Sequence, residues 1–322
     1  MNRRSLLGGA ALATTAGLVI RQSNTSHIPR RRSRPSHVAV LRCDRYERTP
    51  QVVDQGLQLV TPSVDGRRVL LKPNLVEYSP AAPINTHPML IAAVIDALYR
   101  LGATSVIVAE GPGHIRDIDL LLHESGLRAQ LEILKRASFV DLNFDAVTRV
   151  VPGTGLTHLK EIWLPTTVQS ADVVISMPKV KTHHWAGVTL SLKNSFGILP
   201  GSIYGWPKIL LHWQGIDNSI VELAVSAPIH FVIADGIEAM EGNGPLHGPM
   251  RRLGCLVFAD DPVAADATCC RLMGIDPSRV RYLQMASPLG NLDTSHIEQR
   301  GEVVEDVAQQ FELLPQFAHL RG

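Results

Sequence analysis

The chain of 322 residues is 45% hydrophobic and 19% charged, which allows a large buried core in one α/β domain or in two smaller lobes. Its formal net charge of +1 and its aromatic content of 5% argue against a nucleic-acid partner, because proteins that bind nucleic acids usually have basic surfaces and aromatic side chains that stack on bases. The four cysteines show no C-x-x-C spacing, so this chain has no iron–sulfur motif and no cysteine-based zinc motif.

The N-terminus differs in composition from the rest of the chain. Arg3 and Arg4 precede an apolar run of small residues, 9–20, which together have the basic start and the length of a signal peptide. Consecutive arginines at this place resemble a twin-arginine export signal. We therefore expect residues 1–22 to be a twin-arginine-like signal, with an uncleaved membrane anchor as the alternative, and residues 23–36 to be a basic linker. On this interpretation the twin-arginine machinery exports the protein to the periplasm or cell envelope.

Strand and helix patterns alternate from residue 36 onward. The first expected strands are 37–41, 68–71 and 104–109, and the first expected helices are 51–60 and 89–101. This rhythm is typical of an α/β fold with a largely parallel or mixed sheet and helices on both faces. Residues 117–137 have a helical pattern, and 138–165 have the short strands of a small inserted β-rich layer. We expect residues 37–304 to form a single α/β domain and 305–322 to form a C-terminal tail.

Polar residues follow the expected strands of the first half. Lys72 and Asn74 come after the second strand, and Glu110 ends the third, at the edge where open α/β sheets usually bind ligands. Thr86 is the expected N-cap of helix 89–101. Because a helix start can itself hold an anion, Thr86 and His87 are both candidates for ligand-facing positions. The alternative for each is an ordinary turn or surface residue.

The densest group of candidate residues lies at 176–197, directly after the apolar strand 172–176. We interpret this stretch as a packed loop followed by a short helix-like segment, 188–196, between two glycines. It contains Lys179, Lys181, His183, Lys193 and Asn194. Several cations within so short a stretch can bind an anion, although single lysines at strand ends are often only solvated.

Carboxylates gather at strand ends in the second half. The apolar strand 228–234 leads into Asp235 and Glu241 within a glycine-rich turn, an arrangement that suits a metal site or acid–base chemistry, or else a solvated loop. Asp261 or its neighbour is expected to cap a helix that ends at Met273, and Asp266 lies a turn inside that helix. The candidate metal ligands are therefore Asp235, Glu241 and Asp266, and a divalent metal is the cofactor that these residues suggest.

The ordered series of motifs resembles a known family. The motifs are Lys72-Pro-Asn74, Thr86-His-Pro88, Glu110-Gly111, Pro178-Lys-Val-Lys-Thr-His183, Leu190-Ser-Leu-Lys-Asn194, Asp235-Gly236, Glu241-Gly-Asn-Gly-Pro245 and Asp261-Pro-Val-Ala-Ala-Asp266. Together they resemble the family catalogued as domain of unknown function 362, from about residue 37 to about 304. The resemblance implies one α/β unit and an exported location. It implies no reaction.

The leading functional hypothesis is an exported enzyme that acts on a small carboxylate or phosphate compound. In it the anion is held by Lys72, Lys179, Lys181 and Lys193, with hydrogen bonds from Asn74, Asn194, Thr86 and His87. His183 is the candidate general acid–base because of its ordinary pKa. Glu110, Asp235 and Glu241 are expected to supply a second acid–base group or to hold a metal.

The alternative hypothesis is a non-catalytic accessory protein that delivers a ligand, metal or cofactor to a redox partner. It rests on the resemblance, because some relatives carry an appended ferredoxin segment. The twin-arginine route, which carries folded proteins, is compatible with cargo that is loaded before export. Both hypotheses require polar residues from several strand ends to converge on one site.

Overall fold

The computed structural model describes residues 28–29, 34–113 and 117–321. The expected twin-arginine-like signal therefore lies outside the described residues, as does most of the expected linker. Within the described ranges, no helix combines the length and the apolar character needed to cross a membrane.

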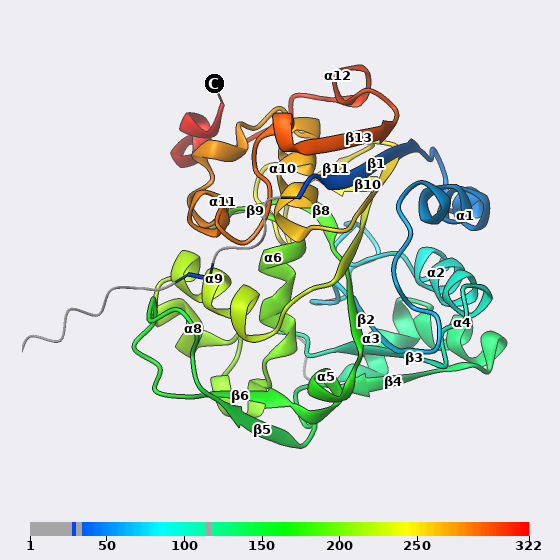
Figure 1. Cartoon of the computed structure of the whole chain (residues 1–322), viewed down its shortest axis with the longest axis vertical. Helices are drawn as coiled ribbons and strands as arrows, with labels where there is room; N and C mark the ends of the chain where they lie inside the picture. Colours follow the sequence, from blue (N-terminus) through cyan, green and yellow to red (C-terminus); the bar gives the residue numbers. More distant parts are fainter. Residues whose placement is uncertain (1–27, 30–33, 114–116, 322) are drawn as a thin grey trace, which may run out of the picture.

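The expected α/β fold is confirmed (Figure 1). Its central feature is a mixed sheet with the strand order β13-β1-β12-β10-β7-β2-β3-β4. Neighbours are parallel from β10 through β7, β2 and β3 to β4, whereas β12 is antiparallel to both β10 and β1. The strand bounds are β1 Ser36–Arg42, β2 Arg68–Pro73, β3 Ser105–Glu110, β4 Ala137–Asp141, β7 Val173–Met177, β10 Phe231–Met240, β12 Cys255–Ala259 and β13 Ile297–Gly301.

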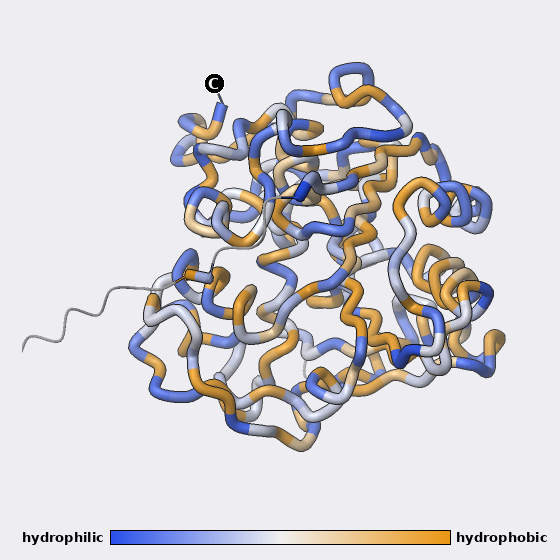
Figure 2. The backbone as a smooth tube through the Cα atoms, viewed as in Figure 1, coloured by the Kyte–Doolittle hydropathy of each residue, from blue (hydrophilic) through white to orange (hydrophobic). Residues whose placement is uncertain are grey.

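Helices cover both faces of this sheet, as expected. One face packs against α1 Thr49–Leu59, α2 Pro88–Arg100, α3 Ile118–Glu124 and α4 Leu127–Leu134. The other packs against α9 Ile216–Ser226, α10 Pro262–Leu272 and α11 Arg281–Ala286. Each face of the sheet has its own hydrophobic core, and successive residues of a strand contribute to the two cores in turn. In β1, Val38 and Val40 belong to one core and Ala39 belongs to the other. Figure 2 shows the hydrophobic colour following the strands through the interior.

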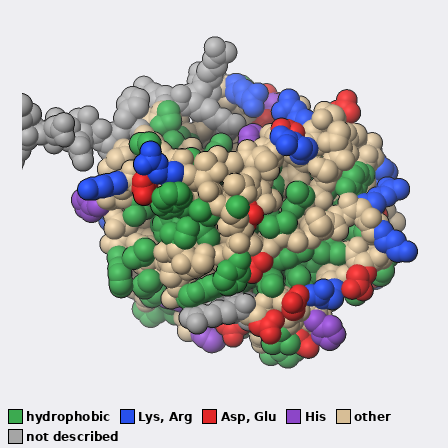
Figure 3. Space-filling view, turned by 90° about the horizontal axis from the view of Figure 1, so that it is seen from below, with side chains coloured by type: hydrophobic (Ala, Val, Ile, Leu, Met, Phe, Trp, Pro, Cys, Tyr) green, Lys and Arg blue, Asp and Glu red, His purple; other side chains and the backbone are tan. Residues whose placement is uncertain are grey.

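The middle of the chain differs in part from the expected inserted layer. Only β5 Val147–Val150 and β6 Ile162–Pro165 form a separate two-stranded sheet, followed by α5 Thr166–Ser170. Strand β4, at the start of that stretch, instead pairs with β3 and extends the main sheet. The β5–β6 pair lies at the lower edge of the view in Figure 1. The face seen from below in Figure 3 carries hydrophobic side chains in its middle and charged groups toward its edges.

The stretch after β7 is a strand and not the expected loop. Residues Lys179–His183 form β8, which pairs with β10 and with the short β9 Gly187–Thr189. The reason is the length of β10, which continues past the expected strand end at Ala234 to Met240 and offers backbone groups to β8. The expected helix-like segment is confirmed only in its later part, as α6 Ser191–Asn194 and the 3₁₀ turn η2 Ser195–Ile198.

The N-cap of α2 lies one residue later than the expected Thr86. Its N-cap is His87, whose Nδ1 accepts a hydrogen bond from Met89 N. The Thr86 hydroxyl is already engaged, because it donates to Met177 O at 2.6 Å and accepts from Asn74 N at 2.9 Å. Thr86 therefore ties the segment after β2 to the end of β7.

The remaining elements are short helices, 3₁₀ turns and one short strand. Residues 206–224 contain α8 Ile209–Trp213 and most of α9, and α7 Gly201–Tyr204 precedes them. The 3₁₀ turn η1 Tyr46–Arg48 precedes α1, and the C-terminal part contains the short β11 Met250–Arg251, α12 Val304–Val307, and the 3₁₀ turns η3 Pro277–Arg279, η4 Thr294–His296 and η5 Pro315–Leu320.

Candidate functional site

A cavity of about 120 Å³ lies where the carboxyl ends of β2 and β3 meet β8, β9 and α6. We call it the lysine cavity, because Lys181, Lys193 and Lys208 line it. The other polar residues around it are Asn74, Glu110, His183, His184, Thr189, Asn194 and His212. The convergence of the first two strand ends is the arrangement expected for parallel neighbours.

The buried ion pair between Lys72 and Glu110 supports one side of the cavity. Lys72 Nζ lies 2.5 Å from Glu110 Oε2 and also donates to Asn194 Oδ1 at 3.2 Å. Glu110 accepts further hydrogen bonds from the backbone N–H groups of Leu75 and Gly111. Burial lowers the pKa of Lys72, and the neighbouring Glu110 carboxylate opposes this. Lys72 therefore has its own counter-ion within the protein.

The three lysines that name the cavity have no carboxylate in ion-pair contact among the described residues. Lys181 Nζ donates to two backbone carbonyls, Ile84 O at 2.7 Å and Pro245 O at 3.4 Å. Lys208 Nζ donates to Asn143 Oδ1. Lys193 Nζ lies 3.8 Å from the centre of the Phe196 ring. Glu110 is the one acidic residue in the described lining, so cationic groups outnumber carboxylates.

Burial lowers the pKa values of these three lysines. It lowers the pKa of Lys193 to about 7, with help from the charge of Lys72. It lowers the pKa of Lys208 to about 7 as well, although Glu110 opposes the shift. The pKa of Lys181 also lies well below its ordinary value, chiefly through burial and then through the charges of Lys179 and Lys193. Any negative group placed in the cavity would reverse these shifts.

Two further polar side chains of the cavity are buried without a hydrogen-bond partner. Asn74 Oδ1 and Thr189 Oγ1 make no hydrogen bond within the described structure. A buried polar atom left without a partner destabilises a protein by about 1–3 kcal/mol. Such atoms are rare in folded proteins, and a ligand or water in the cavity would satisfy both.

His183 is held as a hydrogen-bond donor. Its Nδ1 accepts from the backbone N–H groups of Trp185 at 3.0 Å and Ala186 at 3.2 Å, which places the proton of the neutral ring on Nε2. Burial, followed by the charge of Lys193, lowers its pKa well below the ordinary value. This environment does not favour the general acid–base role expected for His183, because the ring has a strong preference for its neutral form.

His184 has the opposite arrangement. Its Nδ1 lies 2.9 Å from Gly244 O, and a carbonyl can only accept, so Nδ1 carries the proton and Nε2 is the basic atom of the neutral ring. Its ring stacks on that of His183, with centroids 5.0 Å apart. Of the two adjacent histidines, His184 is therefore the one suited to accept a proton.

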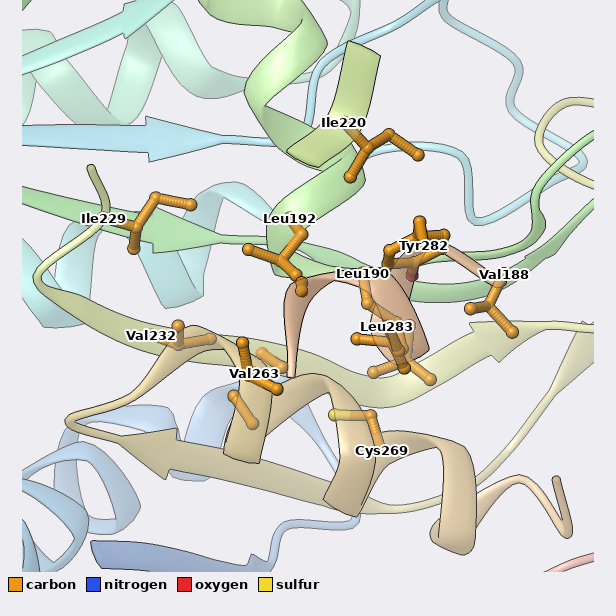
Figure 4. Packing of buried hydrophobic residues seen from close by; sticks show 14 of the residues in the cluster. Val188, Leu190, Leu192, Ile220, Ile229, Val232, Val263, Cys269, Tyr282 and Leu283 are labelled. Atoms are coloured by element: carbon orange, nitrogen blue, oxygen red, sulfur yellow. The ribbon is translucent and has the colours of Figure 1, made fainter. Parts of the chain in front are cut away.

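The segment that carries Lys193 and Asn194 is anchored in the core. Figure 4 shows Val188, Leu190 and Leu192 packed among Ile220, Val263, Cys269, Tyr282 and Leu283. Asp266 holds the start of α6, because it accepts hydrogen bonds from Ser191 N at 2.7 Å and Leu192 N at 3.0 Å. Asn194 Nδ2 donates to Lys72 O at 3.1 Å. These contacts fix where the Lys193 backbone lies.

The expected site is divided between two cavities. Thr86, His87 and Lys179 line a second, more open cavity of about 460 Å³. There Lys179 Nζ pairs with Asp235 Oδ2 at 2.8 Å and bonds to Tyr46 OH at 2.9 Å. Asp235 thus neutralises Lys179. Thr86, His87, Lys179 and Asp235 are therefore not among the residues that line the lysine cavity.

The three candidate metal carboxylates are not brought together. Asp235 pairs with Lys179, Asp266 accepts from the start of α6, and Glu241 lies 3.7 Å from Arg251 and accepts from Glu312 N. In the described ranges, no group of three or more histidine, cysteine and acidic side chains is arranged to hold a metal ion. The expected metal set is therefore wrong as a set, because long-range pairing sends each carboxylate to a different partner.

Lys208 is a lysine of the cavity that the sequence did not indicate, just as it did not indicate the polar residues Thr189 and His212. It follows Trp206-Pro207 in the connection between α7 and α8, where no strand end or motif marks it. Its contact with Asn143 brings it to the cavity from a distant part of the chain. His184, by contrast, lies within the predicted cluster.

Comparison with known proteins relates the chain to one family. The model of the family described as domain of unknown function (DUF362) matches residues 69–271. A thylakoid-associated protein of Synechocystis sp. is 29% identical over 230 residues, which are 70% of this chain and 68% of that protein.

Two solved structures show a general likeness. A Thermotoga maritima protein from a structural genomics programme has a TM-score of 0.44 and 13% identity over 72% of this chain. The lactate racemase apoprotein of Thermoanaerobacterium thermosaccharolyticum has a TM-score of 0.41 and 11% identity over 75% of this chain. The matches span 60% and 58% of the lengths of those two chains.

Proposed function

The chain belongs to the DUF362 family, and we propose that it is an enzyme that acts on a small carboxylate or phosphate compound bound in the lysine cavity. The observation that carries the proposal is the set of cavity lysines without carboxylate partners among the described residues. Buried ammonium groups are unfavourable without a counter-charge. A bound anion would supply that charge.

The hydrogen-bonding groups of the cavity support a small oxyanion as the ligand. Lys181 and Lys208 donate to fixed oxygen atoms and can direct their remaining N–H groups to an anion. His183 offers its Nε2–H as a neutral donor. Asn74 and Thr189 have unpartnered polar atoms for a second polar group of the same ligand. A volume of about 120 Å³ suits a compound of a few non-hydrogen atoms, since water occupies roughly 30 Å³ in the liquid.

Proton transfer is the chemistry that the lining favours. His184 offers a basic Nε2, and Lys193 has a pKa of about 7, so both protonation states of Lys193 are present near neutral pH. A base beside a cationic anion-binding group can remove a proton from the carbon next to a carboxylate, because the cations stabilise the charge that develops. In this proposal Lys181 and Lys208 bind the anionic group, and His184 moves the proton.

Titration calorimetry with malonate, pyruvate and inorganic phosphate tests the binding step. We expect saturable binding of at least one of these anions, and we expect Lys181→Met and Lys208→Met to weaken it by about tenfold or more, which corresponds to ~1.4 kcal/mol. Lys160→Met is the matched control, because Lys160 is exposed and does not line the cavity. Equal affinity in all three variants would contradict the proposal.

Proton exchange in deuterium oxide separates an enzyme from a carrier. We expect the protein to accelerate exchange at the carbon next to the carboxylate or carbonyl group, and His184→Gln to abolish the acceleration while binding persists. Binding without any accelerated exchange would instead assign the accessory function, in which the protein delivers its ligand to a redox partner.

Export by the twin-arginine route is a separate proposal that rests on residues 1–22 alone. Replacement of both Arg3 and Arg4 by lysine is expected to retain the protein in the cytoplasm of its own host. Cell fractionation with antibody detection checks this, and an unchanged distribution would contradict the proposal.

A further inference from the structure

We propose that Lys193 forms a covalent imine with the carbonyl carbon of a 2-oxo carboxylate bound in the lysine cavity. This inference rests on the proposed function and specifies its substrate class. The carboxylate would be held by Lys181 and Lys208, and the adjacent carbonyl would face Lys193. The three lysines would then have two different roles, anion binding and nucleophilic attack.

The hydrogen bonds distinguish Lys193 from the other two lysines. Lys181 and Lys208 each donate to an oxygen atom of the protein, which favours their protonated form and fixes their position. Among the described residues, no hydrogen-bond acceptor contacts Lys193 Nζ, which lies over the face of the Phe196 ring. An amine acts as a nucleophile through its lone pair, and no protein acceptor competes to keep this amine protonated.

The electrostatic surroundings are compatible with this role but do not single out Lys193, because burial lowers the pKa of Lys181 and Lys208 as well. Lys72, Glu110, Lys181 and His183 are the charged or titratable groups that interact with Lys193. Burial and the charge of Lys72 lower its pKa to about 7, so near neutral pH about half of the amine is unprotonated. An ordinary lysine with a pKa of about 10.4 has roughly a thousandfold smaller unprotonated fraction at that pH.

The cavity also holds groups for the intermediate. The amine nitrogen bonds to the carbonyl carbon, and the carbonyl oxygen takes a proton to become a hydroxyl group. Loss of that hydroxyl as water leaves the protonated imine, so a ketone and a lysine ammonium ion give an iminium ion and one water molecule. Asn74 Oδ1 and Thr189 Oγ1, which have no partner within the described structure, line the same cavity and would bind the hydroxyl, and no oxidant or reductant is needed.

Reductive trapping tests the inference on the full chain. The protein is incubated with pyruvate and sodium cyanoborohydride at pH 7, and the modified lysine is located by peptide mass spectrometry. We expect the reduced pyruvate adduct at Lys193, at about tenfold or more above the level at exposed Lys160, given the difference in unprotonated amine. Malonate, which has a carboxylate but no ketone, is expected to suppress the adduct by competition and to form none.

Peptide mapping of the unaltered protein avoids dependence on a variant that fails to fold. Lys193→Met is expected to lose the adduct, and a circular dichroism spectrum checks its fold. Pyruvate binding that depends on Lys181, together with no adduct at Lys193, would overturn the imine and leave the proposed function standing. A similar level of adduct at Lys193 and Lys160 would also overturn it. No binding of malonate, pyruvate or phosphate would refute the proposed function itself.

Discussion

Lys72 and Glu110 form a buried ion pair, with Nζ and Oε2 2.5 Å apart, across the neighbouring parallel strands β2 and β3. Both side chains are 1% exposed, so neither can exchange its partner for water. Loss of one member leaves the other charge buried without compensation. We therefore expect both the stability of the sheet and the position of Asn194 in the cavity wall to depend on this pair.

Glu110→Gln is expected to destabilise the protein by about 3–5 kcal/mol, because it leaves the Lys72 ammonium without a counter-ion. Urea unfolding measures the change in the free energy of unfolding. Glu161→Gln is the matched control, since the Glu161–Arg149 pair is exposed and such pairs contribute about 0–1 kcal/mol. A loss below 1 kcal/mol for Glu110→Gln would contradict the importance of the pair.

Gly197→Ala is expected to displace the same ion pair. A Cβ atom at this position would lie 1.8 Å from Glu110 Oε1 and 2.7 Å from Lys72 Nζ, distances that no real Cβ maintains. We expect lower stability and weaker binding of malonate, measured by urea unfolding and calorimetry. Gly113→Ala is the control, because Gly113 also lines the cavity but an added Cβ would meet no atom nearer than 3.5 Å. Equal effects of the two substitutions would contradict this explanation.

Asp266 is expected to make stability depend on pH. Burial raises its pKa from an ordinary value near 3.8 to about 8 in the folded protein. Between those values the folded state binds the proton more tightly than the unfolded state, so stability falls as pH rises, by at most ~1.4 kcal/mol per pH unit. Asp266→Asn removes this contribution, and urea unfolding at pH 5 and pH 7 should show a weaker decline for the variant. An identical decline would rule out Asp266 as its source.

Malonate binding is expected to weaken as pH rises above 7. Lys193 and Lys208 have pKa values of about 7, so above that pH both are increasingly neutral, and an anion bound beside them favours the uptake of protons. Affinity should fall by up to about tenfold per pH unit for each proton taken up. Calorimetry between pH 6.5 and 8.5 measures this slope, which should be shallower in Lys193→Met than in the Lys160→Met control.

The sequence alone predicts that Lys72 and Glu110 lie at the same edge of the sheet. The apolar runs that precede Lys72 and Glu110 identify two strands, and parallel neighbours necessarily bring their carboxyl ends to the same edge. The grouping of Lys181, His183, Lys193 and Asn194 in one stretch likewise indicated part of the cavity. These inferences depend on local periodicity and chain direction, which the sequence carries directly.

The division of the site was decided by tertiary structure. Lys179 and Lys181 are two residues apart, yet one pairs with Asp235 and the other lines the lysine cavity, and the register of β8 against β10 shifts between them. Local sequence also could not assign Asp266 to the start of α6 or Glu241 to Glu312, since those partners are brought together by long-range packing.

The sequence alone determined the fold class and which strand ends carry charge, since both follow from residue order and local periodicity. Only the tertiary structure decided which of those charges are neutralised within the protein. Lys72 and Lys179 find carboxylates, whereas Lys181 and Lys193 do not within the described residues, and Lys208 joins them from a loop without any motif. The physical reason is that ion pairing depends on distances of a few ångströms between residues far apart in the chain.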